Sequence, residues 1–354
     1  QVVQNLNGDT QLLEVPVPEI KKGHLLIRTT VSLISSGTER MLVEFGKASY
    51  LEKARQQPEK VKQVIDKIKT DGFFETFDRV KSKLDQPLPL GYCNTGIVVA
   101  SDIPEFSIGD RVISNGPHAE FVCMPVNLCA KVPPSLSNDE AVFTVLGAIA
   151  LHAIRLSQPN FGDTVSVVGL GLVGLLCAQI AKANGCRVIG FDFDEEKVKI
   201  AKNFGVEAFS FGDPDDALKI SNKFTSNNGV DITLVAAASQ NSDPMILGAK
   251  MCRKKGKLTQ VGVTELSIPR EIMFKKELQL QVSCSYGPGR YDEKYENEGI
   301  DYPYSYVRWT ENRNFSAILD ALKEKKIEVL DLISHEFDFE KSSQAYDLIM
   351  NNKS

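Results

Sequence analysis

Residues 169–174 have the sequence Gly-Leu-Gly-Leu-Val-Gly, and their position between two regular segments restricts the fold more than any other feature of the chain. The apolar run Thr164–Val168 before them is typical of a buried strand, and Val173–Asn184 after them has the pattern of a helix. A strand, a glycine-rich turn and a helix in this order form the first unit of a doubly wound α/β sheet. The sequence therefore predicts such a sheet, with the turn beside its ligand crevice.

The three glycines have separate roles in a turn of this kind. Gly169 permits the tight turn, Gly171 lets the backbone approach a pyrophosphate, and Gly174 lets the helix pack closely against the strand. The start of the helix, at Leu172 and Val173, offers free N–H groups and a partial positive charge to phosphate oxygens. We therefore predict that a dinucleotide binds here.

An acidic residue at the end of the next strand indicates which dinucleotide binds. Asp192 follows Gly171 by 21 positions, close to the spacing of about 20 residues that is typical of this motif. Its carboxylate would accept hydrogen bonds from ribose hydroxyls and repel a 2′-phosphate, so NAD is favoured over NADP. The remaining predicted cofactor contacts are Phe193, Lys197, Ala236, Ala237 and Gly262.

Apolar strands and helices alternate from Thr164 onward, as in a parallel sheet covered by helices. The predicted strands are Thr164–Val168, Arg187–Phe191, Ala208–Phe211, Ile232–Ala236, Lys257–Val261 and Leu278–Ser283. The predicted helices are Val173–Asn184, Glu195–Asn203, Asp215–Thr225, Pro244–Met251 and Pro269–Lys276. In the tail we expect helices at Phe315–Lys325 and Phe339–Asn351 and a strand at Ser334–Phe337.

The first part of the chain has a different texture, with short strands separated by Gly and Pro, which indicates a barrel. The strands are expected at Leu12–Val17, His24–Ile34, Gly96–Ala100, Asp110–Ser114, Ala119–Met124 and Leu128–Val132. Between them, Ala48–Asp85 has helical spacing and many charges, and it is either a structural insertion or a lid or interface over a cleft. Ser137 and Glu140 form a capping box for a helix that runs to about Leu156.

The composition fits a globular chain of two domains, since 42% of its 354 residues are hydrophobic and 25% are charged. A net charge of −5 gives no indication of a nucleic-acid or membrane partner, and no apolar run reaches the length of a membrane span. The N-terminus lacks the regions of a signal peptide, and the seven cysteines include no Cys-x-x-Cys pair. We therefore expect a cytoplasmic protein.

Three further segments show what the whole chain resembles. Phe106-x-x-Gly109-Asp110-Arg111-Val112, His118-Ala119-Glu120-Phe121 and Lys131-Val132-Pro133 precede the dinucleotide fold. In this order they resemble the medium-chain dehydrogenase/reductase superfamily, the alcohol dehydrogenase-like fold. The resemblance covers nearly the whole chain. It implies a GroES-like barrel at 1–140 with the helical insertion at 48–85, a Rossmann domain at 141–285, and a C-terminal return to the barrel at 286–354.

A narrower resemblance rests on Leu33–Arg40, Pro87–Asn94 and Tyr302–Glu311. These segments look like a bacterial bi-domain oxidoreductase family, in which a dehydrogenase half is fused to a Gfo/Idh/MocA-type sugar oxidoreductase half. This family is typically linked to cell-surface polysaccharide biosynthesis, and the resemblance implies that the chain is its N-terminal half. The segment Ser36-Gly37-Thr38-Glu39-Arg40 also resembles bacteriochlorophyllide dehydrogenases of the same superfamily.

The resemblance also bears on metal binding. Zinc-dependent members hold a catalytic zinc at positions that fall here on Ser36, the pair Tyr92-Cys93, and a residue near Thr144. Hydroxyl groups are poor replacements for the thiolate, imidazole or carboxylate ligands of zinc, and Cys93 alone could not hold the ion. The loop that carries four cysteines for a structural zinc is also missing. We therefore predict a zinc-free enzyme.

Without zinc, another group has to manage the proton and the developing oxyanion. Tyr92 is the first candidate, as a hydrogen-bond donor or proton carrier that needs a lowered pKa or a relay. Thr38 matches the hydroxyl that relays protons in zinc members, or it is a turn residue, and Ser36 is a further candidate. His118 is either a base near the cleft or a structural histidine.

Substrate contacts are expected from two regions. Glu39 and Arg40 either position substrate or form a buried ion pair, and Asn94, in the segment Pro87–Asn94 of the narrower resemblance, is a further predicted contact. Arginines and aromatic rings between Cys284 and Glu311 suit sugar rings or a phosphate-bearing ligand, or else form an aromatic minicore or a domain interface. The residues chosen there are Tyr286, Arg290, Tyr304, Arg308 and Trp309.

Three functions are weighed. The leading one is a zinc-independent, NAD-dependent oxidoreductase that acts on an alcohol or ketone group of a sugar or sugar nucleotide. The second is a quinone or enone reductase, against which Asp192 argues because such reductases usually prefer NADP. The third is a cofactor-binding half without chemistry of its own. Many members dimerise through an edge strand, here Leu278–Ser283, so a homodimer is also considered.

Overall fold

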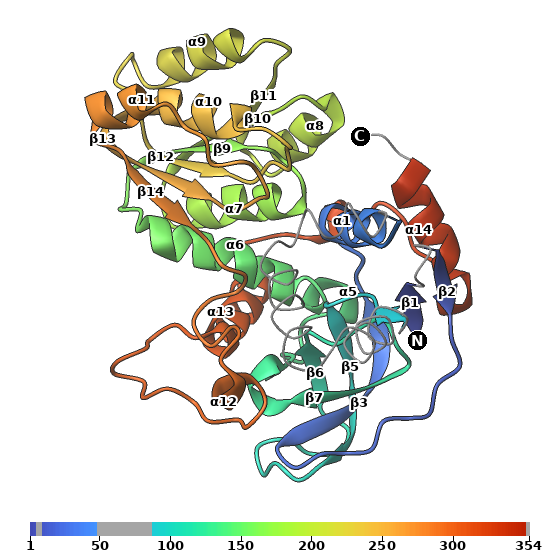
Figure 1. Cartoon of the computed structure of the whole chain (residues 1–354). Helices are drawn as coiled ribbons and strands as arrows, with labels where there is room; N and C mark the ends of the chain where they lie inside the picture. Colours follow the sequence, from blue (N-terminus) through green and yellow to red (C-terminus); the bar gives the residue numbers. More distant parts are fainter. Residues whose placement is uncertain (5–8, 48–86, 352–354) are drawn as a thin grey trace, which may run out of the picture.

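The computed structural model describes residues 1–4, 9–47 and 87–351, which form two lobes (Figure 1). The predicted helical insertion at Ala48–Asp85 lies outside the described residues. One lobe contains a six-stranded parallel sheet, and the other contains two antiparallel sheets. The predicted fold class, a barrel-type domain joined to a doubly wound sheet, is confirmed.

The parallel sheet has the strand order β11-β10-β9-β12-β13-β14. The chain runs outward from the central strand β9 to β11 and then returns to β12 on the other side of β9, so the connection reverses direction between these two strands. Ligands of doubly wound sheets bind beyond the carboxyl ends of the strands at such a reversal. The bounds are β9 (Thr164–Val168), β10 (Arg187–Asp192), β11 (Glu207–Ser210), β12 (Val230–Val235), β13 (Cys252–Gln260) and β14 (Gln279–Val282).

Helices cover both faces of this sheet because its strands are apolar on both sides: all five residues of β9 are buried. Figure 1 shows α9, α10 and α11 on one side and α7 with α6 on the other. All six predicted strands and all five predicted helices of this region are present, with ends shifted by a few residues. The helices are α7 (Leu172–Ala183), α8 (Glu195–Asn203), α9 (Pro214–Phe224), α10 (Asp243–Met251) and α11 (Arg270–Lys276).

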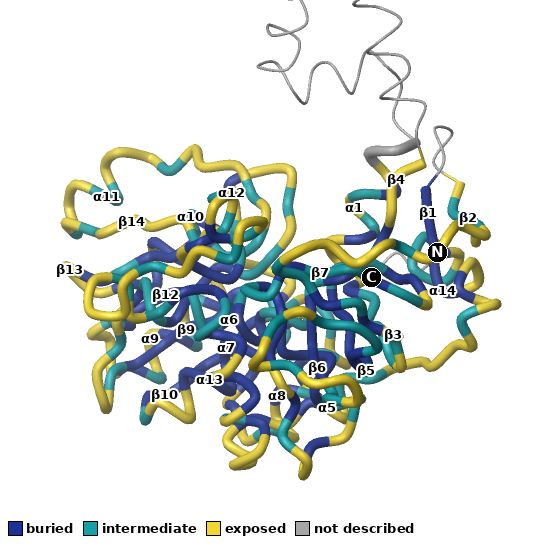
Figure 2. The backbone as a smooth tube through the Cα atoms, turned by 90° about the horizontal axis from the view of Figure 1, so that it is seen from below, coloured by how far each residue is buried: buried dark blue, intermediate teal, exposed yellow. Residues whose placement is uncertain are grey.

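The second lobe is built on a five-stranded antiparallel sheet of order β7-β3-β5-β6-β8 and a three-stranded sheet of order β2-β1-β4. Leu25, Ile27 and Val98 are fully buried at the centre of the larger sheet. In Figure 2, the buried parts of the backbone are dark blue. The bounds are β1 (Val2–Gln4), β2 (Thr10–Leu12), β3 (His24–Ser32), β4 (Leu88–Pro89), β5 (Asn94–Ser101), β6 (Arg111–Ser114), β7 (Phe121–Pro125) and β8 (Cys129–Lys131), with the 3₁₀ turn η1 (Val126–Leu128) before β8.

Two predicted strands are wrong. The first, Leu12–Val17, extends only to Leu12, and it contains Pro16, which has no N–H group for a strand ladder. The second, Ser334–Phe337, is exposed and irregular, because no neighbouring strand pairs with it among the described residues. A pattern of β-forming residues does not make a strand without a partner for its backbone groups.

The helix predicted to begin after Ser137 is interrupted. The capping box is present, since the Ser137 side chain accepts from the Glu140 N–H and the Glu140 side chain accepts from the Ser137 N–H. However, α5 (Asn138–Ala141) and α6 (Thr144–Ser157) are separate helices. The Thr144 hydroxyl donates to the Ala141 carbonyl at 2.6 Å, and a side chain that bonds the backbone in this way competes with the regular helix ladder.

By length and composition, residues 138–157 could cross a membrane, so the expectation that no stretch reaches this size is wrong. Of its most apolar window, 67% is buried inside the protein, as in a core helix.

The C-terminal part contains α12 (Glu293–Glu296), α13 (Glu311–Lys323), the 3₁₀ turns η2 (Leu330–Leu332) and η3 (Phe339–Lys341), and α14 (Ser342–Asn351). Figure 1 shows α14 beside α1 (Ser36–Lys47) and β2 in the barrel lobe.

Candidate active site

The glycine-rich turn lies between β9 and α7, and its three glycines meet different surroundings. Gly169 has a φ of +94°, which favours glycine, and a Cβ there would lie 2.6 Å from the Ala237 backbone nitrogen. A Cβ on Gly174 would lie 1.9 Å from the Gly169 carbonyl oxygen. A Cβ on Gly171 would meet nothing within 4 Å. The turn is therefore tightly packed on its inner side and open at Gly171, where a pyrophosphate would approach.

Asp192 ends the neighbouring strand β10 and is fixed beside the turn. Its Oδ2 accepts a hydrogen bond from the Leu170 N–H at 2.6 Å, and its Oδ1 accepts from the Asp194 N–H at 3.0 Å. These bonds fix the carboxylate at the carboxyl end of the strand. Carboxylates have further acceptor positions, so a ribose hydroxyl could still donate to this group.

The other predicted cofactor residues lie around the same edge of the sheet. Phe193 is 70% exposed and packs on Phe211, with ring centroids 4.4 Å apart. Lys197 Nζ lies 3.5 Å from an Asp194 carboxylate oxygen. Ala236, Ala237 and Gly262 follow β12 and β13, and a Cβ on Gly262 would lie 2.2 Å from the Ala237 carbonyl oxygen. The cradle, the fixed acid and these small residues fit a dinucleotide.

The residues that the family resemblance places at the zinc-ligand positions are Ser36, the pair Tyr92-Cys93 and Thr144. Ser36 is exposed at the start of α1, whereas Thr144 is fully buried and donates its hydroxyl hydrogen to Ala141. Cys93 is fully buried, and burial raises the pKa of its thiol well above the ordinary value. Within the described residues, no group of three or more His, Cys, Asp or Glu side chains could hold a metal ion.

Tyr92 and Thr38 are brought together, although they are 54 positions apart in the sequence. The Tyr92 hydroxyl donates to Thr38 Oγ1 at 3.3 Å. Burial, followed by the charge of Cys93, raises the pKa of Tyr92 above its ordinary value. Of the two alternatives considered for Tyr92, a lowered pKa is therefore not met, whereas a relay through Thr38 remains a prediction. A phenol that keeps its proton donates hydrogen bonds and stabilises an oxyanion, but it is not a base near neutral pH.

His118 and Glu39 form a buried pair. His118 Nε2 lies 3.1 Å from Glu39 Oε2, and His118 Nδ1 lies 2.9 Å from Ser32 Oγ. Glu39, which is 0% exposed, also accepts from the Ser35 N–H and from the Tyr346 hydroxyl on α14. The side chains of this group thus use their hydrogen-bonding atoms on one another; they are Ser32, Glu39, His118 and Tyr346. This arrangement corresponds to the structural alternative considered for His118.

The predicted partner of Glu39 is wrong. Arg40 does not pair with Glu39 but lies at the surface, where its Nε donates to Glu44 Oε1 at 2.9 Å. Since Glu39 has no exposed surface, its carboxylate does not face a substrate in this structure. The true partner, Tyr346, is 307 positions away, and no local pattern in the sequence marks it.

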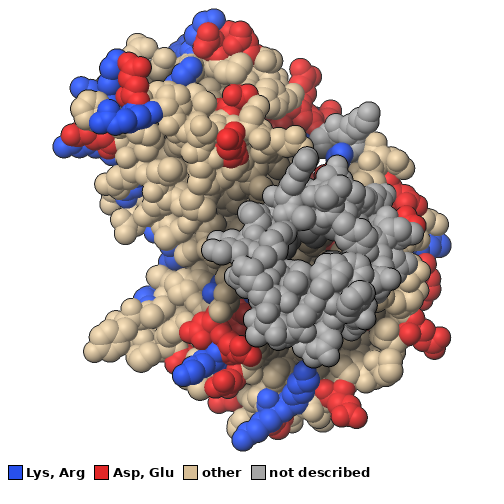
Figure 3. Space-filling view, in the orientation of Figure 1, with Lys and Arg blue, Asp and Glu red and all other residues tan. Residues whose placement is uncertain are grey.

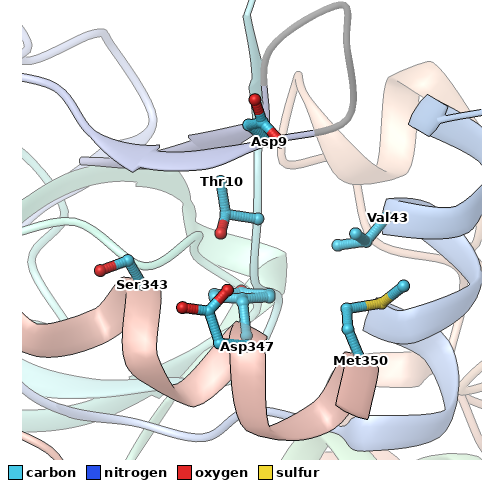
Figure 4. A pocket seen from close by; sticks show the side chains of 7 residues that line it. Asp9, Thr10, Val43, Ser343, Asp347 and Met350 are labelled. Carbon is cyan, nitrogen blue, oxygen red and sulfur yellow. The ribbon is translucent and has the colours of Figure 1, made fainter.

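A small cavity of about 210 Å³, partly lined by Tyr346, lies between β2, α1 and α14 (Figure 4). It is lined by Asp9, Thr10, Val43, Ser343, Tyr346, Asp347 and Met350. None of these residues belongs to the glycine-rich turn or to the Tyr92–Thr38 pair, so this cavity is not part of the candidate active site.

Two predicted substrate residues are buried. Asn94 is 1% exposed, and its Nδ2 donates to Thr29 Oγ1 at 2.7 Å, whereas its Oδ1 has no partner among the described residues. The Tyr286 hydroxyl accepts from Asn115 Nδ2 at 2.9 Å, which joins the barrel to the segment after β14. Burial raises the pKa of Tyr286.

Arg290 belongs to a cluster that the sequence did not reveal. Its Nη1 donates to Glu296 Oε1 at 2.5 Å, and its Nε is buried without a partner in the described part of the chain. Glu311, at the start of α13, is fully buried close by, and neither of its carboxylate oxygens has a hydrogen-bond partner there. Burial, and then the charge of Glu296, raise the pKa of Glu311 to about 8. A carboxyl in this position is largely protonated at neutral pH.

Arg308, Trp309 and Tyr304 do come together, and with them lies Arg155, which the sequence reasoning missed. The guanidinium carbons of Arg155 and Arg308 lie 3.3 Å and 3.7 Å from the Trp309 ring centroid. Arg155 is in the last turn of α6, 11 residues after Thr144. Its Cα therefore lies about 16 Å along the helix from that of Thr144.

A barrel domain and a doubly wound sheet with a glycine cradle at its reversal point are the features that the chain shares with known proteins. The chain is similar to the alcohol dehydrogenase-like superfamily of medium-chain dehydrogenases/reductases, and it is an NAD(P)-dependent oxidoreductase. Residues 173–298 match the family described as zinc-binding dehydrogenase.

Individual relatives agree with this class. A sorbitol dehydrogenase of Halalkalibacterium halodurans is 26% identical over 310 residues, which cover 75% of this chain and 81% of the relative. A probable D-xylulose reductase A of Emericella nidulans is 26% identical over 246 residues, 58% of this chain and 68% of the relative. The solved structure of alcohol dehydrogenase TADH from Thermus sp. ATN1 superposes with a TM-score of 0.74 at 18% identity, over 98% of this chain and 95% of that one.

Proposed function

We propose that the chain is an NAD-dependent, zinc-independent oxidoreductase that acts on the alcohol or ketone group of a sugar or polyol. The observation that carries the proposal is the hydrogen bond between Tyr92, which the family resemblance places at a zinc-ligand position, and Thr38, which matches the proton-relaying hydroxyl of zinc-dependent members. The polyol and sugar classes are supported by relatives whose names are sorbitol dehydrogenase and D-xylulose reductase.

Each residue has a defined part in this proposal. NAD, when bound, supplies the hydride acceptor or donor. Gly171 leaves space for its pyrophosphate, and Asp192 accepts from its ribose hydroxyls. Tyr92 keeps its proton and donates a hydrogen bond to the substrate oxygen, which is an alkoxide before hydride leaves and after hydride arrives; the alcohol proton passes to water in oxidation and returns from water in reduction. When Tyr92 donates to the substrate, the Thr38 hydroxyl donates to the Tyr92 oxygen and orients it, because the phenol has a single hydrogen.

Replacing Tyr92 by phenylalanine tests the catalytic part. We expect Tyr92→Phe to lower kcat by about 100-fold or more, because it removes the donor to the oxyanion, while NADH binding is unchanged. The measurement is NADH formation with sorbitol and xylitol, before and after treatment with EDTA. The matched control is Tyr306→Phe, since Tyr306 is 88% exposed. Unchanged turnover in Tyr92→Phe removes Tyr92 from the mechanism, and loss of wild-type activity with EDTA contradicts zinc independence.

Replacing Asp192 by asparagine tests the cofactor preference. We expect Asp192→Asn to weaken NADH binding about tenfold and to strengthen NADPH binding, because the substitution removes both a charged acceptor and the repulsion of a 2′-phosphate. The measurement is titration of each cofactor by fluorescence. Asp194→Asn is the control, since Asp194 caps α8 and should not affect the preference. A wild-type protein that binds NADPH more tightly than NADH contradicts this assignment.

The finer expectations from the sequence are proposals of the same kind. They are a place in surface polysaccharide biosynthesis, a fused sugar oxidoreductase half, a cytoplasmic location and a homodimer. The homodimer is supported by β14, whose four residues are exposed at an edge of the parallel sheet. An exposed edge strand offers unpaired backbone groups to a second copy.

A further inference from the structure

Trp309, the single tryptophan of the chain, lies between two arginines just before α13. The guanidinium carbon of Arg155 is 3.3 Å from the ring centroid, and that of Arg308 is 3.7 Å from it. Two planar groups cannot both lie directly over one face of a ring, so they lie on opposite faces, roughly 7 Å apart. The Arg308 guanidinium also lies over the Tyr304 ring, at 4.6 Å.

The charges of these two arginines are not balanced by protein. In the described ranges, neither Arg155 nor Arg308 has a carboxylate oxygen within 4.0 Å, whereas Arg290 pairs with Glu296 and Arg313 pairs with Asp301. Burial, and then the charge of Arg308, lower the pKa of Arg155 to about 10. Two like charges held this close cost free energy, which an anion bound beside the edge of the Trp309 ring would offset.

Several surface cations elsewhere are paired with carboxylates. Figure 3 shows Lys and Arg gathered at the end of the doubly wound lobe farthest from the barrel. There Arg253 pairs with Asp231, and Lys255 and Lys275 lie near Glu277 and Glu271. The number of basic residues therefore does not mark the Trp309 region. What marks it is a pair of uncompensated guanidinium groups in a fixed geometry.

The geometry also leaves donors free. Arg155 Nε donates to Asn314 Oδ1 at 2.9 Å, which fixes the plane of the guanidinium group. Among the described residues, no acceptor is bonded to the other N–H groups of Arg155 or to Arg308, which is exposed. Guanidinium forks match the spacing of phosphate oxygens, and the faces of Trp309 and Tyr304 keep the forks in place.

We propose that Arg155, Arg308 and Trp309 form a binding site for the phosphate group of a small molecule, separate from the catalytic centre. The Cα of Arg155 lies about 16 Å along α6 from that of Thr144. The proposal does not depend on the substrate class proposed above, since none of its residues belongs to the glycine-rich turn or to the Tyr92–Thr38 pair.

Trp309 provides the readout, because all tryptophan fluorescence of the chain comes from this side chain. The full chain, free of NADH, is titrated with sodium pyrophosphate at an ionic strength held constant with NaCl. We expect a saturable change in emission. Arg308→Gln should weaken the apparent affinity about tenfold or more, since one charge-assisted contact is lost. Arg155→Gln should do the same, and circular dichroism verifies that both variants fold.

The matched control is Arg270→Gln, because Arg270 lies over the single ring of Phe274 on the exposed helix α11. It should bind pyrophosphate like the wild type. Parallel titrations with inorganic phosphate and with a sugar monophosphate determine whether the phosphate alone is sufficient. The proposal is overturned if no saturable change occurs, if NaCl alone reproduces it, or if it persists in both arginine variants. NADH binding, measured separately, should remain intact in Arg308→Gln, so a failure here is distinct from a failure of the proposed function.

Discussion

Gly174→Ala is expected to lower the free energy of unfolding by about 2 kcal/mol or more and to weaken NADH binding by roughly 100-fold. The added Cβ would lie 1.9 Å from the Gly169 carbonyl oxygen. The carbonyl oxygen belongs to the backbone, so no flexible side chain can rotate out of the way of the new Cβ. The helix α7 therefore has to move away from β9. Because the same turn forms the pyrophosphate cradle, stability and cofactor binding are lost together.

Gly171→Ala is the matched control for this result. A Cβ at Gly171 meets nothing within 4 Å, so the protein without cofactor should unfold at the wild-type denaturant concentration. NADH binding should still weaken, because the methyl group occupies the space intended for the pyrophosphate. Urea unfolding and NADH titration of both variants check the pair. If Gly171→Ala binds NADH normally, the cradle is not where the cofactor lies. If Gly174→Ala is as stable as the wild type, the close contact does not limit the packing of α7.

Glu311→Gln is expected to make the protein more stable at pH 8, by about 2–4 kcal/mol, while changing it little at pH 5. In the folded chain, burial and the charge of Glu296 raise the pKa of Glu311 to about 8, from an ordinary value of 4.5. Between these two values the unfolded chain releases a proton that the folded chain retains. Stability is therefore fully present below pH 4.5 and is lost as the pH rises through 8. Glutamine has no proton to lose.

Urea unfolding at pH 5, 6.5 and 8 checks this second result. The difference in stability between wild type and Glu311→Gln should grow steadily with pH. The control is Glu298→Gln in the same segment, because Glu298 is exposed and its replacement should matter by less than about 0.5 kcal/mol at every pH. A constant difference across the pH range would mean that Glu311 does not titrate in this window, and that its unpartnered oxygens are satisfied by water.

Local patterns predicted the parts of this protein that depend on neighbouring residues. The glycine-rich turn, Asp192 at the end of the next strand, and the capping box of Ser137 were each visible in a few consecutive positions. Their roles follow from backbone geometry, which short segments determine. The doubly wound sheet followed in turn from the alternation of strands and helices along the chain.

Contacts between distant parts of the chain were not predictable in this way. Glu39 was expected to act on substrate or to pair with Arg40, but it is saturated by His118 and Tyr346. Arg155 lay unnoticed in a helix pattern, since its role depends on Trp309, 154 positions later. The strand expected at Ser334–Phe337 failed for a related reason: a strand requires a partner, and the sequence does not show whether one is present.

The contact between Glu39 and Tyr346 also determines the order in which the two lobes can finish folding during synthesis. One small hydrophobic core contains Val2, Val43, Leu90 and Tyr346. This core of the barrel lobe is therefore incomplete until α14 has left the ribosome. The parallel sheet, in contrast, has all of its strands once Val282 has emerged. Domains generally fold as units as they emerge. The lobe that begins the sequence is thus the last to be closed.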